Sequence, residues 1–582
     1  MKERKRMKPG FIIALLFAAG LFASCSRGGG DTPTSQSGSD GNSDRNTDMT
    51  QTVAVDAELK DGKYKNVIYN KNGIRITFGA VGGQNLFEPD SEIGFFAQIT
   101  GESLDNTDAK VTFTSTYLRV NRELPFRLEQ SNGKTHTYSG AFSAELNGVY
   151  TLTLVLEGDI RLSFRVGVVP KNKTASDSFY FGVQPYISRA YTWGSGHSVG
   201  GQGVDESERS IFNTVEWLGC NVIREDGTVW ETMQPTEESE LNFTWMDRLV
   251  KAAGSRGIKL NWLLQSTPKW AAKQEYLSMT DENMYWSVCP VEEKWDKYAR
   301  ALAERYAKEN GILWEIWNEP DWEFFTGKPE DYLSLLERTA KIFREVNPSV
   351  YLYPGGLTVV NEPSDYRYKD SRPYFAGFRR LLDGKLINNY SVHIHGTFGE
   401  KYFYGTLEEM TRQAKEAGLS TEGIYNTEAG VFETNEQTQA EHLMSKILYT
   451  RGHGFGMYVQ YSFRAVPSQP EDGWAIFDSY LQPKKAAIAY AVLIGKLGQC
   501  EKTGTVSDER MLYADIYGDG KQSVVTVFGE GGTLTLPEGV ACSAYDMYGN
   551  PTEIINNTVK ASLAPIYLVY EGNVIPEQFS CR

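Results

Sequence analysis

The chain has 582 residues, more than one hydrophobic core usually organises, and this length predicts several domains. Hydrophobic residues make up 41% and charged residues 23% of the chain, which is typical of soluble globular proteins and excludes a multi-span membrane protein. The net charge of -15 repels phosphate backbones, so nucleic acid is not an expected partner and an uncharged ligand is favoured.

The first 25 residues have the organisation of a bacterial signal peptide. A basic start precedes an apolar run at 11–23, which is too short to span a bilayer. The run ends in Leu21-Phe22-Ala23-Ser24-Cys25, which resembles a lipobox, where the cysteine carries lipid and becomes the mature N-terminus. Plain cleavage after Ser24 is the alternative. We expect lipidation at Cys25 and anchoring to a bacterial membrane, at the outer membrane or cell surface.

Residues 26–52 are rich in Gly, Ser, Asp and Thr and nearly free of apolar side chains, which is typical of a flexible linker. Residues 53–172 then alternate apolar and polar side chains in short runs such as Ile74-Arg75-Ile76-Thr77-Phe78. Turn signals such as Asn132-Gly133 and Asn147-Gly148 separate these runs. The pattern predicts an N-terminal antiparallel β-sandwich.

Residues 173–498 change to strand-like apolar runs that alternate with amphipathic helical stretches, such as 329–346. Eight such units over about 320 residues have the period and size of a (β/α)8 barrel. An open doubly wound sheet is less favoured, because no glycine-rich phosphate fingerprint follows the first predicted strand. The predicted strands are 179–184, 221–225, 259–264, 313–317, 350–353, 390–395, 423–427 and 456–463.

Residues 499–576 return to short β runs, for example 524–528 and 566–570, and predict a small C-terminal β-sandwich. The predicted fold is therefore multidomain, α/β plus all-β: a (β/α)8 TIM barrel flanked by N-terminal and C-terminal β-sandwich domains. Five cysteines remain after Cys25, an odd number that cannot pair completely within one chain. Buried free thiols are the preferred interpretation, and a bridge among Cys500, Cys542 and Cys581 is the alternative.

Two glutamates end predicted barrel strands. Glu319 ends the fourth in Trp317-Asn318-Glu319-Pro320, and Glu428 ends the seventh in Asn426-Thr427-Glu428-Ala429. Catalytic residues of such barrels lie at the C-terminal ends of the strands, and the fourth and seventh strands face each other across the barrel mouth. Retaining glycosidases use two carboxyl groups about 5–5.5 Å apart, one as acid/base and one as nucleophile. The pattern therefore favours glycoside hydrolysis.

Asn-Glu-Pro after the fourth strand, with a Glu ending the seventh, resembles the signature of clan A of the glycoside hydrolases. Within the clan, the segment 314–321, followed by Tyr332 and Tyr353-Pro354-Gly355-Gly356, is most similar to family 39, with family 5 a near neighbour. The resemblance covers roughly residues 179–498. It implies a retaining O-glycoside hydrolase acting by double displacement on oligo- or polysaccharides. It also implies Glu319 as acid/base, Glu428 as nucleophile and Asn318 as a ligand of the sugar 2-hydroxyl.

Arg224 ends the second predicted strand, where the clan carries an arginine that contacts the nucleophile, and its charge would keep Glu428 ionised. A structural ion pair is the alternative. His393 and His395 lie two apart on the sixth strand and match the clan's His-x-Tyr, except that His395 replaces the tyrosine. That replacement leaves open whether the nucleophile receives its usual hydrogen bond. Zinc is disfavoured, because no third ligand has recognisable spacing.

Trp270 follows the third strand and Trp474 lies in the loop after the eighth, and both are candidates for stacking on a sugar ring. Core packing is the alternative, more so for Trp270. Gln184 ends the first strand and is a candidate partner for a sugar hydroxyl. Glu315 shares the strand face of Glu319 but lies deeper, so we expect it in a buried charge network. We expect no cofactor and no metal.

Two other functions compete with hydrolysis. A non-catalytic cell-surface glycan-binding lipoprotein could use the same barrel, but the presence of both glutamates argues against it. A sugar-phosphate enzyme is disfavoured, because no glycine-rich loop follows the last two predicted strands and the chain is acidic. Loops and surfaces decide the sugar, the linkage and the oligomeric state, and the strand pattern does not define them.

Overall fold

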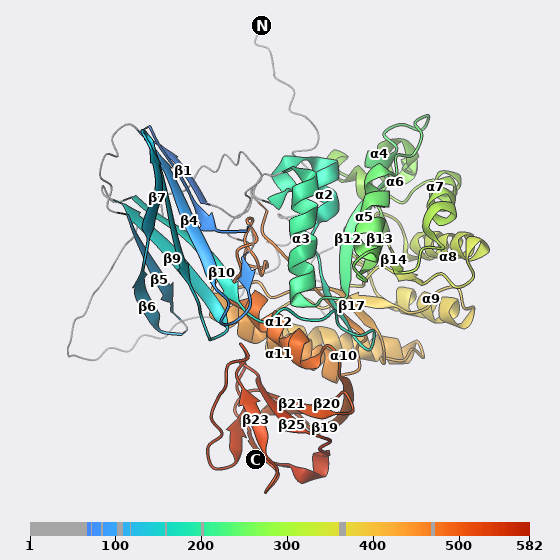
Figure 1. Ribbon diagram of the computed structural model, residues 1–582. Coiled ribbons are helices and arrows are strands. Elements are labelled where there is room, and N and C mark those ends of the chain that lie inside the picture. The colour runs from blue at the N-terminus through green and yellow to red at the C-terminus, as the bar shows by residue number, and fades with distance from the viewer. Residues whose placement is uncertain are drawn as a thin grey trace, which may run out of the picture.

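The structure is a computed structural model that describes residues 67–582, apart from 72, 83–84, 102–108, 117, 157–159, 200–202, 360–367 and 467–471. The predicted signal peptide, the lipidation site Cys25 and the linker at 26–52 lie outside the described residues. Three regions follow one another: a β region, an α/β region and a second β region (Figure 1). Among the described helices, none combines the length and apolar character needed to cross a bilayer.

Two five-stranded sheets form the N-terminal region. Along β9 (Gly148–Leu156) fully buried and half-buried side chains alternate, so one face of the sheet lies in a core. Phe78, Phe95 and Leu152 from the two sheets are fully buried there, which confirms the predicted sandwich. In spatial order the sheets contain β1 (Val67–Lys71), β2 (Ile74–Ala80), β4 (Ile93–Thr100), β8 (Thr135–Phe142) and β7 (Arg127–Asn132), and β3 (Leu86–Phe87), β10 (Ile160–Val168), β9, β5 (Lys110–Ser115) and β6 (Val120–Leu124).

Eight parallel strands form the central sheet, and every one overlaps a predicted strand. A parallel bridge between Leu357, just after one end strand, and Val392 of the other joins the two ends of the sheet, so the sheet closes into a barrel. Strand β14 (Ile312–Ile316) is buried at every position, because helices cover its outer face and side chains fill the inside. The predicted (β/α)8 fold is confirmed. The other strands are β11 (Tyr180–Val183), β12 (Val222–Val229), β13 (Lys259–Gln265), β15 (Leu352–Pro354), β16 (Ser391–His393), β17 (Tyr425–Ala429) and β18 (Met457–Gln460).

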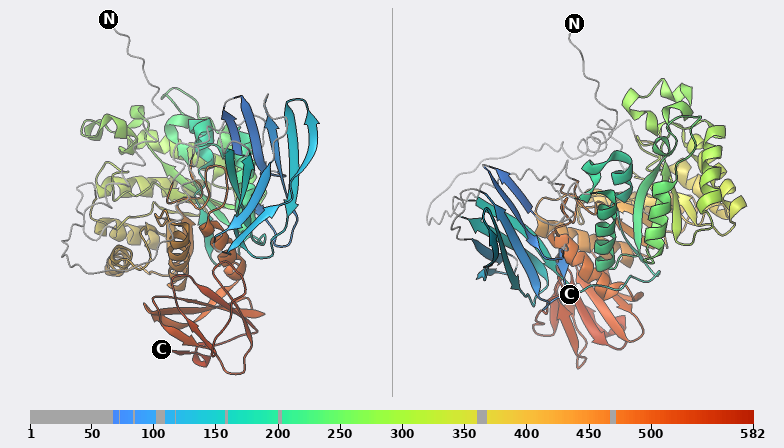
Figure 2. Two further views of the ribbon diagram at one scale, coloured as in Figure 1. Left: turned by 90° about the vertical axis from the view of Figure 1, so that its left-hand side faces the viewer. Right: turned by 45° about the horizontal axis from the view of Figure 1, so that its top comes forward.

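Helices surround the barrel (Figure 2). Helix α8 (Pro329–Val346) begins with a proline, whose fixed φ suits a first turn, and buries one face on the strands. Helix α12 (Lys485–Leu497) is buried on nearly all sides, because the N-terminal sandwich covers the face that the barrel leaves free. The other α-helices are α2 (Ile187–Trp193), α3 (Val204–Leu218), α4 (Trp230–Met233), α5 (Thr244–Gly254), α6 (Gln274–Leu277), α7 (Glu292–Tyr306), α9 (Arg372–Asp383), α10 (Lys401–Glu416) and α11 (Glu436–Gly452).

A five-stranded and a three-stranded sheet form the C-terminal region and enclose a core that includes Ile516, Val525 and Leu568. The predicted second all-β domain is confirmed, and its last strand lies beyond the predicted end at residue 576. The five described cysteines are free, and three of them are buried. The strands are β19 (Glu501–Glu509), β20 (Leu512–Gly518), β21 (Gln522–Phe528), β25 (Ile566–Glu571) and β23 (Cys542–Tyr545), and β24 (Thr558–Lys560), β22 (Thr533–Thr535) and β26 (Ser580–Cys581).

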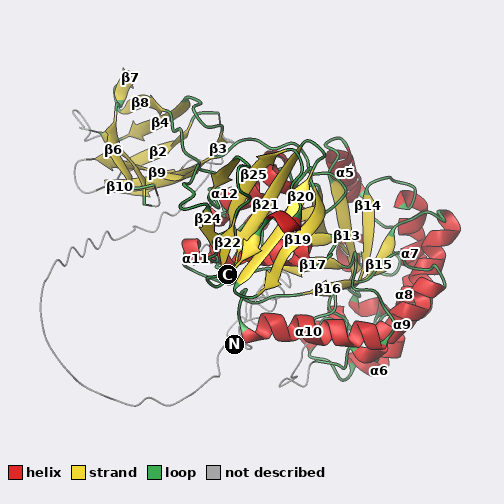
Figure 3. Cartoon of the chain, turned by 90° about the horizontal axis from the view of Figure 1, so that it is seen from below, coloured by secondary structure: helices red, strands yellow, loops and turns green. Residues whose placement is uncertain are grey.

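Both β regions contact the barrel and each other (Figure 3). Arg165 of the N-terminal sandwich forms an ion pair of 2.5 Å with Glu436 at the start of α11. The side chain of Asn550 in the C-terminal region accepts a hydrogen bond of 2.9 Å from the backbone of Asn147. Ser445 of α11 donates to the Leu563 carbonyl at 2.7 Å. The β regions therefore pack against α11 and α12, the helices that follow the seventh and eighth barrel strands, and help to hold them in place.

Candidate active site

A cleft of about 420 Å³ opens at the C-terminal ends of the barrel strands, where catalytic sites of this fold lie. Strands β12 and β17 and the segments that directly follow β11, β14 and β18 contribute to its walls. Five of the nine candidate catalytic and substrate-binding residues line the cleft, namely Gln184, Arg224, Asn318, Glu319 and Glu428.

The backbone turns sharply where Glu319 follows β14. Trp317 and Glu319 have φ angles of 74° and 42°, in a region that side-chain-bearing residues rarely occupy. Gly355 allows this turn, because a Cβ atom there would lie 2.1 Å from the carbonyl oxygen of Trp317. The hydroxyl of Tyr332 donates to the Ile316 carbonyl at 2.8 Å and holds the strand end from the other side. Such strain persists where the surrounding structure fixes it, commonly at functional sites.

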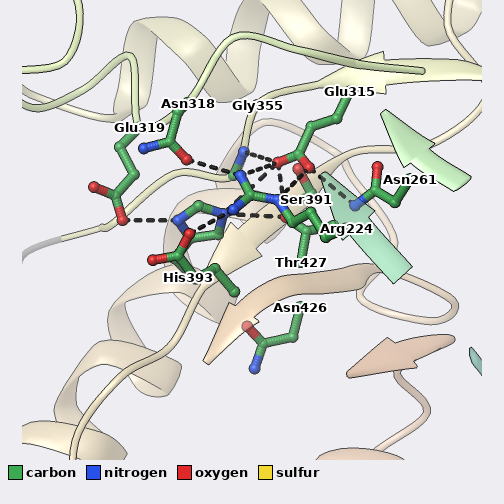
Figure 4. Close-up of polar contacts among 12 residues, drawn as sticks. Arg224, Asn261, Glu315, Asn318, Glu319, Gly355, Ser391, His393, Asn426 and Thr427 are labelled. Carbon is green, nitrogen blue, oxygen red and sulfur yellow. Dashed lines mark hydrogen bonds and ion pairs between the residues drawn. The ribbon is translucent and has the colours of Figure 1, made fainter. Parts of the chain in front are cut away.

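Arg224 is fully buried and donates hydrogen bonds to four side chains, of which Glu315 and Asn318 are labelled in Figure 4. Its Nε and Nη2 donate to Glu315 at 2.7 and 3.1 Å. Nη1 donates to Glu428 Oε2 at 2.5 Å and to Gln184 Oε1 at 3.3 Å. Nη2 also donates to Asn318 Oδ1 at 2.8 Å. One rigid guanidinium thus fixes Asn318 and Glu428, which come from opposite sides of the barrel mouth.

Glu315 is the buried counter-charge of Arg224. Its carboxylate also accepts hydrogen bonds from Asn261 at 3.0 Å, Thr427 at 2.9 Å and the backbone of Gly356 at 3.2 Å. Burial alone would raise its pKa, but Arg224 and a histidine outweigh burial and lower the pKa of Glu315 to about 2. The side chain is therefore ionised and held in place, as a member of the buried network that the sequence indicated.

The two cleft glutamates have pKa values shifted in opposite directions. Burial raises the pKa of Glu319 to about 7, although His393 opposes the shift, and the charge on Glu428 adds to it. For Glu428, burial is outweighed by His395 and Arg224, which hold the pKa well below that of an ordinary glutamate. One carboxyl group can therefore carry a proton at neutral pH while the other is ionised, which is the division that acid and nucleophile require.

His393 supports Glu319 from beneath the cleft. Its Nδ1 lies 2.7 Å from Glu319 Oε1, and its Nε2 lies 3.1 Å from the hydroxyl of Thr427 (Figure 4). Burial lowers the pKa of His393, but Glu315 and Glu319 outweigh burial and raise it to about 9. A Cβ atom at Gly356 would lie 2.1 Å from the imidazole, so only glycine allows this packing.

His395 lies beside Glu428. Its Nε2 is 3.6 Å from Glu428 Oε1, too long for a hydrogen bond, and neither ring nitrogen has a hydrogen-bond partner among the described residues. Burial lowers the pKa of His395. The rings of Trp474 and Tyr461 enclose it, with centroid distances of 5.6 and 5.9 Å. Burial thus disfavours a charged imidazole, whereas the adjacent Glu428 opposes that effect.

The two predicted stacking tryptophans have different surroundings. Trp474 packs against His395, Tyr461 and Phe432, close to Glu428. Trp270 does not line the cleft. Its ring lies 5.1 Å from that of Trp230, and the ammonium of Lys294 lies 5.4 Å from its centroid, which is a core-packing arrangement. Sugar stacking by Trp270 stays a prediction.

Eight lining residues were not identified from the sequence. Arg189 donates to Asp226 at 2.7 and 2.9 Å, and its guanidinium lies 3.4 Å over the ring of Tyr186. No local signal pairs side chains 37 positions apart. Trp322 could have been found, because it follows Glu319 by three residues in the same loop. The eight are Tyr186, Arg189, Asp226, Leu263, Gln265, Trp322, Phe324 and Tyr461.

The site also contains four side chains with possible metal-ligand atoms, all within 4.8 Å of one another: Glu319, His393, His395 and Glu428. Two observations disfavour a cation. His393 Nδ1 is engaged with Glu319, and the guanidinium of Arg224 already lies 2.5 Å from Glu428. We assign no metal site, and the expected lack of a cofactor stays a prediction.

Residues 189–456 match the family model of cellulase, glycosyl hydrolase family 5. A curated relative, a probable mannan endo-1,4-beta-mannosidase A from Aspergillus clavatus, is 28% identical over 112 residues. This match covers 17% of the chain and 31% of the relative, so the chain spans about a third of the length of that protein.

Among solved structures, a family 39 glycoside hydrolase from the gut symbiont Bacteroides cellulosilyticus WH2 has the same fold, with a TM-score of 0.59 and 19% identity. The superposition covers 84% of this chain and 99% of that one, so the likeness extends beyond the barrel to the flanking β regions. The resemblance to clan A glycoside hydrolases, most like family 39 with family 5 near it, is confirmed.

Proposed function

Because the chain is similar to clan A glycoside hydrolases, we propose that it is a retaining O-glycoside hydrolase that cleaves oligo- or polysaccharides by double displacement. One observation supports this most directly: a carboxyl oxygen of Glu319 and one of Glu428 lie within 4.8 Å of each other. Retaining enzymes hold their carboxyl groups about 5–5.5 Å apart, whereas inverting enzymes need about 6.5–9.5 Å to admit a water molecule. The separation therefore favours retention.

In the first step, Glu428 attacks the anomeric carbon and forms a covalent glycosyl-enzyme, while Glu319 donates its proton to the leaving oxygen. The ion pair with Arg224 keeps Glu428 ionised and oriented before attack. The raised pKa of Glu319, to about 7, keeps it protonated in slightly acidic solution. Glu428, which must be charged, thus lies next to the guanidinium of Arg224. Glu319, which must be neutral, has its pKa raised by burial.

In the second step, Glu319 acts as the base that activates water, and the water displaces Glu428. The charge on Glu428 contributes to the raised pKa of Glu319. Once Glu428 is esterified, that charge is gone, so the pKa of Glu319 falls and the residue becomes ready to accept a proton. The same pair of side chains can therefore reverse roles within one turnover.

Neutral sugars suit the cleft, because the two arginines among its described lining residues are already paired with carboxylates, Arg189 with Asp226 and Arg224 with Glu428, and leave no free cation for an acidic sugar. Trp322 and Tyr461 contribute aromatic rings, which pack on sugar faces. The name of the curated relative makes β-mannosides a reasonable part of the first substrate panel.

We also propose that lipid on Cys25 anchors the protein at the outer membrane or the cell surface. An anchored hydrolase could then act on polysaccharides outside the cell. The lipobox-like sequence supports this location.

Proton NMR of the first-formed sugar would test the proposed function, after a panel of nitrophenyl glycosides and plant, algal and host polysaccharides has identified a substrate. We expect the newly formed hemiacetal to have the anomeric configuration of the substrate. An inverted first product would remove Glu428 from the role of nucleophile. Saturable binding of a polysaccharide without cleavage would instead support a glycan-binding lipoprotein.

A further inference from the structure

Two lysines contact the backbone that directly follows Glu319 and Glu428, yet neither lines the cleft. Lys446 of α11 is fully buried, and its ammonium donates to the carbonyl oxygens of Gly396 at 2.9 Å and Gly430 at 3.0 Å. Gly396 directly follows His395, and Gly430 lies two residues after Glu428. One side chain thus joins the segment after β16 to the segment after β17.

Lys446 occupies an unusual environment for a charged group. Among the described residues it has no ion pair, and burial lowers its pKa well below that of an ordinary lysine. The ring of Phe403, with its centroid 5.4 Å from Nζ, provides a further favourable contact. Burial of an ammonium group without a carboxylate is costly, so a lysine at this position needs compensating local contacts.

The hydrogen bonds from Lys446 to the carbonyls of Gly396 and Gly430 are these local contacts. A Cβ atom at Gly430 would lie 2.1 Å from the carbonyl oxygen of Tyr461, and Gly396 has a φ of 93°. Both glycines therefore belong to closely packed turns. By holding both turns, Lys446 fixes the distance between His395 and Glu428, whose Nε2 and Oε1 atoms are 3.6 Å apart.

Lys369 makes equivalent contacts on the other side of the site. Its ammonium donates to the carbonyl oxygens of Pro320 at 3.0 Å and Trp322 at 3.3 Å, and also to that of Phe325. Its backbone N–H donates to the Asp321 carbonyl at 2.7 Å. The loop that begins at Glu319 therefore folds around one ammonium group.

We propose that these lysines are positioning residues for different halves of the reaction, Lys446 for the nucleophile Glu428 and Lys369 for the acid/base Glu319. The proposal rests on the proposed function of the two glutamates. Each lysine acts through the backbone of a loop and does not touch the substrate. The nucleophile is needed to form the glycosyl-enzyme with any substrate, whereas the acid is needed only when the leaving group is poor.

Leaving-group dependence separates the two roles. Methionine is unbranched and replaces the aliphatic stem of lysine as far as Cε but has no N–H donors, so Lys446→Met and Lys369→Met remove the contacts to the carbonyls and keep most of the apolar packing. With 2,4-dinitrophenyl and phenyl glycosides of the same sugar, Lys446→Met should lower kcat/KM by about tenfold or more on both. Lys369→Met should lower it by about tenfold or more on the phenyl glycoside and by less than about threefold on the dinitrophenyl glycoside.

Two further sets of variants complete the experiment. Lys446→Gln and Lys369→Gln retain a side-chain amide donor and should recover part of the loss. Lys496→Met is the control. Lys496 of α12 is half-buried, its ammonium packs over Tyr545, and among the described residues it forms no hydrogen bond with either loop, so the kinetics of this variant should match the wild type. Circular dichroism tests whether each variant is folded. If a methionine variant is unfolded, the kinetics of the glutamine variant at the same position are used to test the proposal.

Equal losses on both glycosides in the Lys369 variants, or unchanged kinetics in the Lys446 variants, would overturn the proposal. Failure of the proposed function has a different signature. In that case Glu428→Gln on either glycoside, or Glu319→Gln on the phenyl glycoside, would itself retain the wild-type kcat/KM, whatever the lysine variants do. If both glutamate variants lose activity as expected but the lysine variants keep the wild-type kcat/KM, the positioning role of the lysines is rejected and the proposed function stands.

Discussion

Arg224 and Glu315 have fully buried side chains and meet through two hydrogen bonds, of 2.7 Å from Nε and 3.1 Å from Nη2. The remaining edge of the guanidinium contacts Glu428 at 2.5 Å. The two buried charges are tolerated because the guanidinium and the carboxylate compensate each other. Loss of either partner would leave an uncompensated buried charge. The ionised state of Glu428 therefore depends on Arg224 in the cleft wall and on the buried carboxylate of Glu315 that compensates its charge.

Replacement of Glu315 by glutamine should destabilise the protein by about 3 kcal/mol, because Arg224 would lose its main buried counter-charge. The measurement is the free energy of unfolding by denaturant, with the thermal midpoint as a second readout. Glu337→Gln is the matched control, because its partners Lys341 and Arg380 are largely exposed, and it should cost less than about 1 kcal/mol. Equal losses in the two variants would contradict a special role for the buried pair.

The pH dependence of kcat/KM should report the two cleft glutamates. Activity should fall as pH rises through about 7, because burial raises the pKa of Glu319 to about 7 and the residue must be protonated to donate. Acidic solution should be tolerated below the usual glutamate range, because the low pKa of Glu428 keeps it ionised. On an activated substrate, Glu319→Gln should lose the alkaline limb. Persistence of that limb would assign it to another group.

The two tryptophans predicted to stack on a sugar should differ in the effect of their replacement. Loss of the Trp474 ring should change the kinetics, and loss of the Trp270 ring should change the stability. Trp474 lies beside His395 and Glu428, so Trp474→Ala should lower kcat/KM by up to about tenfold through lost packing at the site. Trp270→Ala should instead lower the free energy of unfolding by about 3 kcal/mol and leave the kinetics near wild type, because the ring packs on Trp230. Steady-state kinetics and denaturant unfolding of both variants test this. The reverse pattern would return Trp270 to the list of sugar ligands.

The barrel was predictable because its signals are local. Strand β14 was expected at 313–317 and occupies Ile312–Ile316, since an apolar run of that length between turns has few other solutions. Glu319 and Glu428 were found by the same means, because each directly follows or ends such a run. The two sandwiches followed from alternation with period two, as in β9.

Side chains brought together by loops were not predictable. Arg189 and Asp226 pair across 37 positions, and Lys446 contacts Gly396 across 50, with no pattern that connects either pair. Their geometry depends on barrel closure and on turns whose conformations a single sequence does not specify. Arg224 was an intermediate case, because its position at a strand end was visible but its contact with Asn318 was not.

Fractionation of cells should find the protein with membranes, because Cys25 ends a lipobox-like run. Cys25→Ser should release it in soluble, active form, since lipid would be the only anchor. Metabolic labelling with an alkyne fatty acid, followed by immunoblotting of membrane and soluble fractions, is the measurement. Wild-type protein recovered free of lipid in the periplasm or medium would contradict lipidation.

Azide rescue should distinguish the two glutamates by the stereochemistry of the products. In Glu428→Ala the nucleophile is absent, so the covalent intermediate cannot form and activity should fall by several orders of magnitude on any substrate. Azide can occupy the vacated space and attack from the face opposite the leaving group. The expected product is a glycosyl azide of inverted configuration.

In Glu319→Ala the nucleophile remains, so a substrate with a good leaving group should still form the glycosyl-enzyme. The intermediate should accumulate, because no base activates water. Azide needs no base and should release it as a glycosyl azide of retained configuration. NMR of the azide adducts from both variants, made with the best nitrophenyl glycoside, is the test, and Glu337→Ala serves as the control with wild-type kinetics. Swapped configurations would exchange the two roles, and wild-type activity in either variant would eliminate that glutamate and return the glycan-binding lipoprotein as the better explanation.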